Sequence, residues 1–220
     1  MKIADRVEHV LLRPDSIEND VRLLAMAARQ NHLAAIAVPP TWARFAVTAL
    51  AGSAVRVDVP VGYPLGTHTA SAKGLEARLA LEEGAAEVTI VPNLATYKTG
   101  YREIFRQDIA YVIKQSRLAN PDCLVKVLIY VDLLSLAEQR EVVRLVQGSG
   151  GQFLLVGSYA PQPITPALVR RLSEFVEPPA QVGVLGEVRS FEEARPLLDL
   201  GIARLATPFG LEVVREAAES

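Results

Sequence analysis

The stretch Leu124-Val125-Lys126-Val127-Leu128-Ile129-Tyr130 is apolar except for its one lysine. A second apolar run, Gln152–Gly157, follows it, and a stretch of helical character that ends in the glycine-rich junction 148–151 separates the two. A strand, a helix and a second strand in this order form a unit whose strands lie parallel and whose crossover is right-handed. Because both runs are almost continuously apolar, we expect each strand to be covered on both faces.

The same unit recurs in both directions along the chain, about eight times in all. We predict strands at the following runs: Val7–Leu11, Leu33–Val38, Val55–Val59, Glu87–Val91, Leu124–Tyr130, Gln152–Gly157, Gln181–Leu185 and Ala203–Ala206. Short polar residues near Asp15-Ser16 and at Ser190 predict helix starts, and Gly84, Gly150 and Gly201 predict helix ends. This rhythm favours an α/β fold, a (β/α)₈ TIM barrel of one domain over residues 1–220, and a doubly wound open sheet is the alternative.

Composition narrows the function classes. The 23 Lys and Arg against 25 Asp and Glu leave no field of one sign, so we expect no nucleic-acid partner and no membrane surface. No apolar run approaches the roughly 20 residues of a membrane span, and the first residues lack the apolar middle of a signal peptide. We therefore expect a cytoplasmic protein. The single cysteine, Cys123, sits in an apolar setting and is interpreted as a packed thiol rather than a nucleophile.

Several motifs along the chain are similar to those of one enzyme family. They are Glu8-His9-Val10-Leu11-Leu12-Arg13-Pro14, then Gly62-Tyr63-Pro64-Leu65-Gly66-Thr67, then Asn93 with Lys98 and Gly100, then Leu124–Ile129, and finally Gly186-Glu187-Val188-Arg189. Each motif alone is weak, but together and in this order they resemble the deoxyribose-phosphate aldolases over nearly the whole chain. The resemblance implies a TIM barrel.

The resemblance also implies a retro-aldol lyase that holds a phosphosugar and forms a Schiff base through a lysine of the sixth strand. Only a primary amine can condense with the substrate carbonyl to give that imine. Carried over by motif, the nucleophile position falls on Leu155, and the second family lysine, on the seventh strand, falls on Gly183. The fourth-strand carboxylate of the family's proton relay corresponds to Thr89. The resemblance therefore implies a divergent member that lacks the Schiff-base lysine.

The phosphate-binding end implied by the resemblance lies at Gly186 and Gly210. Here the family's second glycine is replaced by Glu187, and its serines after the eighth strand are replaced by Pro208-Phe209. Proline has no amide hydrogen, and a glutamate that pointed inward would repel an anion. We therefore expect weaker phosphate binding.

Lys126 is the only lysine in a predicted strand, and a buried lysine is costly unless it is paired or functional. The family has a site-lining lysine here and an aspartate at the position of Glu8. We favour an ion pair between Lys126 and Glu8, while contact with an anionic ligand and recruited Schiff-base chemistry remain open. If catalysis persists, Lys126 and Glu8 are the candidate catalytic residues.

Other polar residues follow the predicted strands. Thr67 and Asn93 are candidates to bind a sugar-like ligand, and His68 is a further candidate in the same loop as Thr67. His9 should alternate away from Glu8 and pack against the first helix. The three histidines share no metal-binding spacing, so we expect no metal and no cofactor.

Two main hypotheses follow. The first is a non-catalytic or repurposed aldolase relative, a pseudoenzyme that binds a small molecule. The second is an active aldolase or lyase on a phosphosugar or other small carbonyl compound, using Lys126 and Glu8. A third, weaker one is a regulatory partner of an active paralogue. The family's dimers leave a homodimer open.

Overall fold

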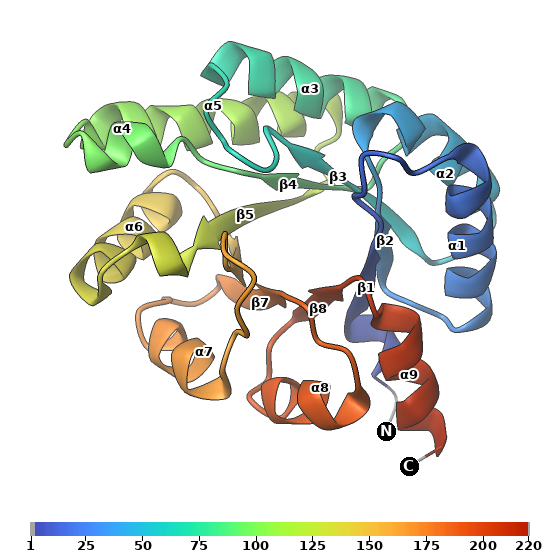
Figure 1. Ribbon diagram of the computed structural model, residues 1–220. Coiled ribbons are helices and arrows are strands. Elements are labelled where there is room, and N and C mark those ends of the chain that lie inside the picture. The colour runs from blue at the N-terminus through green and yellow to red at the C-terminus, as the bar shows by residue number, and fades with distance from the viewer. Residues whose placement is uncertain (1–2, 220) are drawn as a thin grey trace.

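All eight apolar runs form strands, and the strands close into one parallel barrel (Figure 1). The computed structural model describes residues 3–219. Its strands are β1 (Val7–Val10), β2 (Ala35–Ala37), β3 (Arg56–Val61), β4 (Glu87–Ile90), β5 (Leu124–Tyr130), β6 (Phe153–Gly157), β7 (Gln181–Leu185) and β8 (Arg204–Thr207). Val7 of β1 pairs with Leu205 of β8, which closes the sheet. The predicted TIM barrel is therefore confirmed, and the open doubly wound sheet is excluded.

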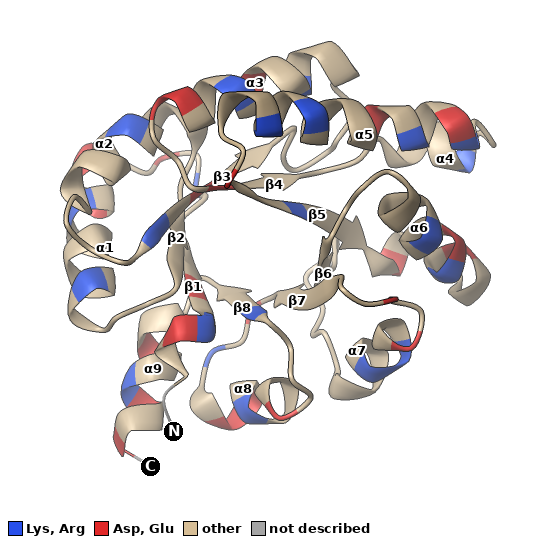
Figure 2. Ribbon diagram, turned by 180° about the vertical axis from the view of Figure 1, so that it is seen from behind, with Lys and Arg blue, Asp and Glu red and all other residues tan. Residues whose placement is uncertain are grey.

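Helices form the outer ring (Figure 1). They are α1 (Glu18–Gln30), α2 (Ala43–Ala49), α3 (Ala70–Glu82), α4 (Leu94–Lys98), α5 (Arg102–Ala119), α6 (Leu136–Gly148), α7 (Pro166–Ser173), α8 (Phe191–Leu198) and α9 (Gly210–Glu219). Short 3₁₀ turns lie at Ala4–Arg6, Pro40–Trp42 and Val131–Leu133. Figure 2 shows that positively and negatively charged residues are interspersed along this ring. No helix in residues 3–219 is long and apolar enough to cross a membrane.

Helix ends follow the local sequence in most places. The Ser190 hydroxyl accepts a hydrogen bond from the Glu193 amide at the start of α8, as predicted. The prediction at α1 was wrong, because neither Asp15 nor Ser16 caps that helix. Its first turn is instead closed by Asp20, whose carboxylate accepts from the Ile17 amide.

The predicted glycine ends are confirmed. Gly84, which follows α3, has a φ of +101°, and a Cβ there would lie 2.8 Å from Val47 of α2. A side chain would therefore be both strained and crowded at this position. Gly150 and Gly201 have positive φ values as well.

The barrel has two apolar regions. The larger lies between the strands and the helices. The smaller lies inside the barrel, and we call it the inner apolar cluster; its buried members are Val10, Ala37, Val91, Leu128, Tyr130, Phe153, Leu155 and Ala206. Inward-facing side chains of alternate strands fill a TIM barrel in layers, so this cluster makes the interior a packed core and not a pore.

Candidate functional site

Charged side chains occupy the interior of the barrel beneath its C-terminal end. Lys126 of β5 is completely buried, and its Nζ lies 2.5 Å from Glu8 Oε2, 3.0 Å from Glu87 Oε2 and 3.4 Å from Asp58 Oδ2. The ion pair expected between Lys126 and Glu8 is present. It belongs to a larger group in which one ammonium contacts carboxylates from β1, β3 and β4.

Arg204 of β8 supplies a second cation to this group. Its Nη2 lies 2.8 Å from Glu87 Oε1, and its Nε lies 3.8 Å from Glu8 Oε2. We call Glu8, Asp58, Glu87, Lys126 and Arg204 the barrel charge cluster. The cluster thus contains three carboxyl groups and two cationic side chains. At the more exposed start of β3, Arg56 Nη1 lies 3.4 Å from Glu87 Oε1.

Electrostatics hold Lys126 in its protonated form. Burial alone would lower its pKa, but Asp58, Glu8 and Glu87 together raise the pKa of Lys126 above its ordinary value. Burial would likewise raise the pKa of Glu87, and Lys126 and Arg204 instead bring it below its usual range. The ammonium is therefore a poor nucleophile here, since nucleophilic attack requires the neutral amine.

Asp58 has the opposite shift. Burial raises the pKa of Asp58 to about 7; Lys126 opposes the change, and the Glu8 and Glu87 carboxylates add to it. Thr89 donates a hydrogen bond of 2.8 Å to Asp58 Oδ2, whereas Oδ1 is buried without a partner. Thr89 therefore acts as a donor to this carboxyl group.

The inner apolar cluster separates the barrel charge cluster from the mouth of the barrel. Lys126, Leu128 and Tyr130 occupy every second position of β5, so their side chains point to the same side of the sheet. Leu128 lies beside Leu155 of β6. Leu155 is only 1% exposed. Tyr130 extends further toward the loop after β3, where its hydroxyl donates to the Pro64 carbonyl oxygen, and its ring contacts Tyr159 edge-on. Apolar side chains therefore cover Lys126.

Leu155 and Gly183 are neighbours in the register of β6 and β7. A Cβ on Gly183 would lie 2.9 Å from the Phe153 ring and 3.1 Å from Arg204 Cβ. Because Gly183 has no side chain, there is room beside it for the Phe153 ring and the Arg204 side chain.

The amides at the expected phosphate-binding end have partners within the chain. Gly186 N donates to Ala206 O, Phe209 N donates to Thr207 Oγ1, and Leu211 N, beside Gly210, donates to His9 Nδ1. Glu187 does not point inward, because its side chain is exposed and forms an ion pair with Arg189. Internal hydrogen bonds, rather than a repelling carboxylate, reduce the donors available to an anion at this end.

His9 forms a contact at the start of α9. Its Nδ1 accepts a hydrogen bond from the Leu211 amide. Burial lowers the pKa of His9, although Glu212 acts in the other direction. A neutral imidazole is consistent with the acceptor role of its Nδ1.

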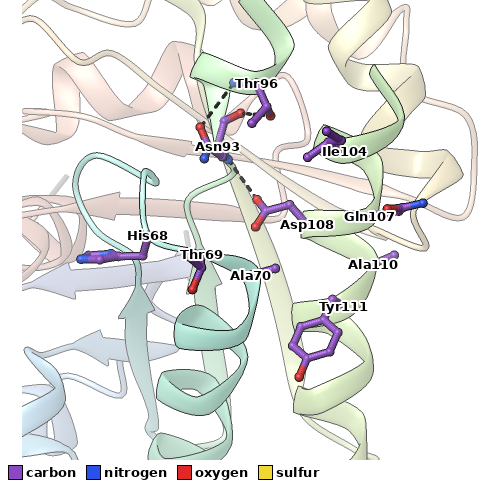
Figure 3. A pocket seen from close by; sticks show the side chains of 10 residues that line it. All are labelled: His68, Thr69, Ala70, Asn93, Thr96, Ile104, Gln107, Asp108, Ala110 and Tyr111. Carbon is purple, nitrogen blue, oxygen red and sulfur yellow. Dashed lines mark hydrogen bonds between the residues drawn. The ribbon is translucent and has the colours of Figure 1, made fainter. Parts of the chain in front are cut away.

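A second polar region lies outside the barrel, between α3 and α5 (Figure 3). We call it the α3–α5 pocket, a cavity of about 540 Å³ lined by His68–Ala70, by Asn93 and Thr96, and by the face of α5 that carries Ile104, Asp108 and Tyr111. The structure thus brings the candidates His68 and Asn93 together, but at this pocket and away from Lys126. Thr67 is exposed and does not line the pocket.

Potential metal ligands are sparse. Within residues 3–219, no three His, Cys, Asp or Glu side chains are arranged to hold a metal ion, and the barrel carboxylates surround Lys126 instead. Cys123 lies just before β5 and is half-buried, and burial raises the pKa of its thiol.

Several charged residues at these sites escaped the sequence interpretation. No functional role was assigned from the sequence to Arg56, Asp58, Glu87 or Arg204. The available signal was the placement of acids at inward positions of predicted strands, as at Asp58 and Glu87. Lys73 and Asp108, whose side chains meet between α3 and α5 at 2.6 Å, had no comparable signal.

Comparison with known proteins agrees with the motifs. No family model matches the sequence. A deoxyribose-phosphate aldolase from Streptococcus sanguinis is 32% identical, over 98% of this chain and 96% of the relative. One from Streptococcus uberis is 31% identical, over 99% and 98% of the two chains.

Solved structures support the barrel fold. An aldolase named QR15 matches with a TM-score of 0.91 and 23% identity, over 99% of this chain and 96% of that one. A tetrameric deoxyribose phosphate aldolase from Aeropyrum pernix matches with a TM-score of 0.87 and 23% identity, over 98% and 91% of the two chains. Because its sequence aligns almost end to end with curated relatives at about a third identity, this chain belongs to the deoxyribose-phosphate aldolase family.

Proposed function

We propose that this member of the family does not carry out Schiff-base retro-aldol chemistry and that it is a repurposed barrel that binds a small molecule. The observation that carries the proposal is the environment of Lys126. Its Nζ is fully buried, contacts three carboxylates and lies beneath Leu128 and Leu155. An amine that stays protonated and covered has no route to a substrate carbonyl.

The chemistry of the imine explains why this environment matters. Condensation needs a free electron pair on nitrogen, and enzymes supply it by lowering the pKa of the lysine through burial or a neighbouring cation. Around Lys126 the dominant neighbours are anions, which favour the charged form. The environment of Lys126 therefore acts against nucleophilic attack.

Other lysines within residues 3–219 are poorly placed for the reaction. Lys73 is buried outside the barrel against Asp108, and Lys98 of α4 pairs with Glu138 of α6. Lys114 is exposed on the outer helix α5. At the family's nucleophile position, carried over by motif, stands Leu155, whose side chain supplies no amine.

An active aldolase that uses Lys126 and Glu8 is the second candidate, and the 2.5 Å contact between the two residues favours it. In that mechanism Glu8 would take a proton from the Lys126 ammonium and give it to the hydroxyl group that leaves as water when the imine forms. Glu8 would then take the proton of the substrate's β-hydroxyl group during C–C cleavage and pass it to the enamine carbon. The amine would also have to leave Glu87 and Asp58 and pass the inner apolar cluster. These requirements make the first candidate the better supported of the two.

Borohydride trapping distinguishes the candidates. The full chain is incubated with acetaldehyde or deoxyribose phosphate, reduced, and examined by intact mass, with the Streptococcus sanguinis aldolase as a positive control. We expect this chain to form no stoichiometric adduct under conditions in which the active site of the control is labelled. A stoichiometric adduct on any lysine would overturn the proposal, and peptide mapping that places this adduct on Lys126 would establish the second candidate.

A further inference from the structure

The α3–α5 pocket lies at the same end of the barrel as the mouth but outside the ring of strands. Its walls come from the loop after β3, the loop after β4, and α5 (Figure 3). Its volume of about 540 Å³ falls in the range typical of small-molecule sites, which are mostly apolar with a few convergent polar groups. The barrel mouth, by contrast, contains the inner apolar cluster.

A buried ion pair fixes the shape of this pocket. Lys73 of α3 donates from its Nζ to Asp108 Oδ2 at 2.6 Å, to Val91 O at 3.0 Å and to Gly66 O at 3.2 Å. Asp108 Oδ2 also accepts from the Asn93 amide at 3.0 Å. These bonds join the loops after β3 and β4 to both helices, so the cavity is formed before any ligand arrives.

The polar groups of the pocket are suited to hydroxyl groups. Both hydrogen bonds of Asp108 fall on Oδ2, and Figure 3 shows its other oxygen turned toward the loop of Thr69 and Ala70. Asn93 Oδ1 accepts from the Thr96 amide and Gln107 Nε2 donates to Glu103 Oε1, so Asn93 offers its side-chain NH₂ as a donor and Gln107 offers its side-chain carbonyl oxygen as an acceptor. Because Lys73 already neutralises Asp108, the lining presents no uncompensated carboxylate to attract a cation.

The remaining wall is apolar. Ile104 and Tyr111 lie on α5, one heptad apart, and are 52% and 40% exposed. The Tyr111 ring rests against Gly74 of α3, where a Cβ would lie 2.6 Å from it. An exposed aromatic ring held in place in this way provides a flat surface on which a ligand can stack.

We propose that the α3–α5 pocket is a binding site for a small uncharged molecule that carries hydroxyl groups on one side and an aromatic or other apolar face on the other. The hydroxyl groups contact Asp108, Asn93 and Gln107, and the apolar face packs on Tyr111 and Ile104. This site does not depend on the absence of imine chemistry, so it stands whichever result the borohydride experiment gives.

The test compares phenyl glucoside with two probes: methyl glucoside, which lacks the aromatic ring, and phenyl phosphate, which has a charged group in place of the sugar. Binding to the full chain is followed through backbone amide shifts in nuclear magnetic resonance titrations. We expect saturable millimolar binding of phenyl glucoside, with the largest shifts at Thr69, Thr96 and Gln107. Methyl glucoside lacks the aromatic face and phenyl phosphate carries charge, so both should bind at least about fivefold more weakly, a loss of ~1 kcal/mol.

Matched variants assign the binding to the pocket. Ala110→Leu adds bulk to the lining on α5 and should weaken phenyl glucoside binding at least about tenfold, or ~1.4 kcal/mol. Ala137→Leu adds the same bulk at an exposed position of α6 and should leave binding unchanged. Gln107→Ala, at an exposed position, is the second variant and should weaken binding several-fold even if Ala110→Leu does not fold.

Three results would overturn the proposal. The first is no saturable binding of phenyl glucoside. The second is shifts that map to the barrel mouth and persist in both Ala110→Leu and Gln107→Ala. The third is a sedimentation experiment in which the wild type forms a dimer that Ala110→Leu dissociates while phenyl glucoside does not bind, which would make this surface a contact between protein chains.

Discussion

Leu155 and Gly183 stand side by side in β6 and β7, and the Cδ1 of Leu155 lies 3.0 Å from the place where a Gly183 Cβ would be. The leucine side chain thus packs over the glycine backbone. These are the two positions at which the motif resemblance leads us to expect the family's lysines. A single lysine introduced at Leu155 would enter an apolar environment without the three carboxylates that surround Lys126.

We predict that Leu155→Lys gains the ability to form an imine. Burial in the inner apolar cluster should lower the pKa of the new lysine, by up to roughly 3 units for a buried amine, and leave part of it neutral at pH 8. Borohydride reduction in the presence of acetaldehyde should then add one label per chain. Leu155→Met, which keeps the bulk but has no amine, is the control and should give no label. Equal labelling of the two variants would contradict the prediction.

Lys126→Met should strongly destabilise the protein. The substitution leaves Glu8, Asp58 and Glu87 buried with Arg204 as their only nearby buried cation, and breaking a buried pair from one side costs about 3–5 kcal/mol. Urea unfolding at pH 7 measures the change in the free energy of unfolding. The loss should shrink at pH 5, because the unpaired carboxyl groups then take up protons. Lys98→Met, which breaks a more exposed pair with Glu138, should cost less than about 1 kcal/mol. Equal stability of the two variants would show that Lys126 is not held as described.

The barrel was predictable from sequence because every strand is an apolar run between helical stretches. The boundaries differ by up to two residues, as at β2, where the run Leu33–Val38 contains a paired segment of only Ala35–Ala37. Leu33 and Val38 are nonetheless buried. Apolarity reports burial, whereas strand ends depend on hydrogen bonding to neighbouring strands, which a single sequence does not reveal.

The sites were predictable only in part. Lys126 was found because a charge inside an apolar run is conspicuous, and Glu8 because it stands at the position of the family's first-strand aspartate. Arg204 lies within the predicted run Ala203–Ala206 and was not given a role. Lys73 and Asp108 lie on polar helices, and only the packing of α3 against α5 brings them together. Long-range contacts of this kind leave no periodic signal.

Asp58→Asn should flatten the pH dependence of stability. The folded-state pKa of Asp58 is raised to about 7 from an ordinary value of 3.8, so the folded protein binds a proton that the unfolded chain releases. The resulting stabilisation is complete below pH 4 and is lost as the pH rises through 7. Relative to Asp58→Asn, the wild type should therefore lose roughly 2–4 kcal/mol of unfolding free energy between pH 4 and pH 8.

Urea unfolding at several pH values measures this difference. Asp15→Asn, at an exposed carboxylate near Arg13, should follow the wild-type curve. A constant offset between the wild type and Asp58→Asn at every pH would mean that Asp58 does not titrate in this range.

Lys73→Met should release the loop after β3. Lys73 is the donor that joins Gly66 O, Val91 O and Asp108. Gly66 itself packs so closely on the segment after β4 that a Cβ there would lie 2.3 Å from Pro92 O. Without the ammonium, Asp108 is a buried carboxylate with no cation, so the loop and the start of α4 lose their common anchor. Amide hydrogen exchange should accelerate at least about tenfold at Gly66 and Asn93, which corresponds to ~1.4 kcal/mol of local stability.

The double variant Lys73→Met/Asp108→Leu separates loss of the anchor from the cost of an unpaired charge. Replacing both partners with apolar groups removes the buried carboxylate, so global stability should recover relative to Lys73→Met alone. Exchange at Gly66 should stay fast, because its carbonyl still lacks the Lys73 donor. Lys114→Met, at an exposed position of α5, should change neither quantity. If exchange at Gly66 returned to the wild-type rate in the double variant, the loop would be held by packing on the segment after β4 rather than by the ammonium of Lys73.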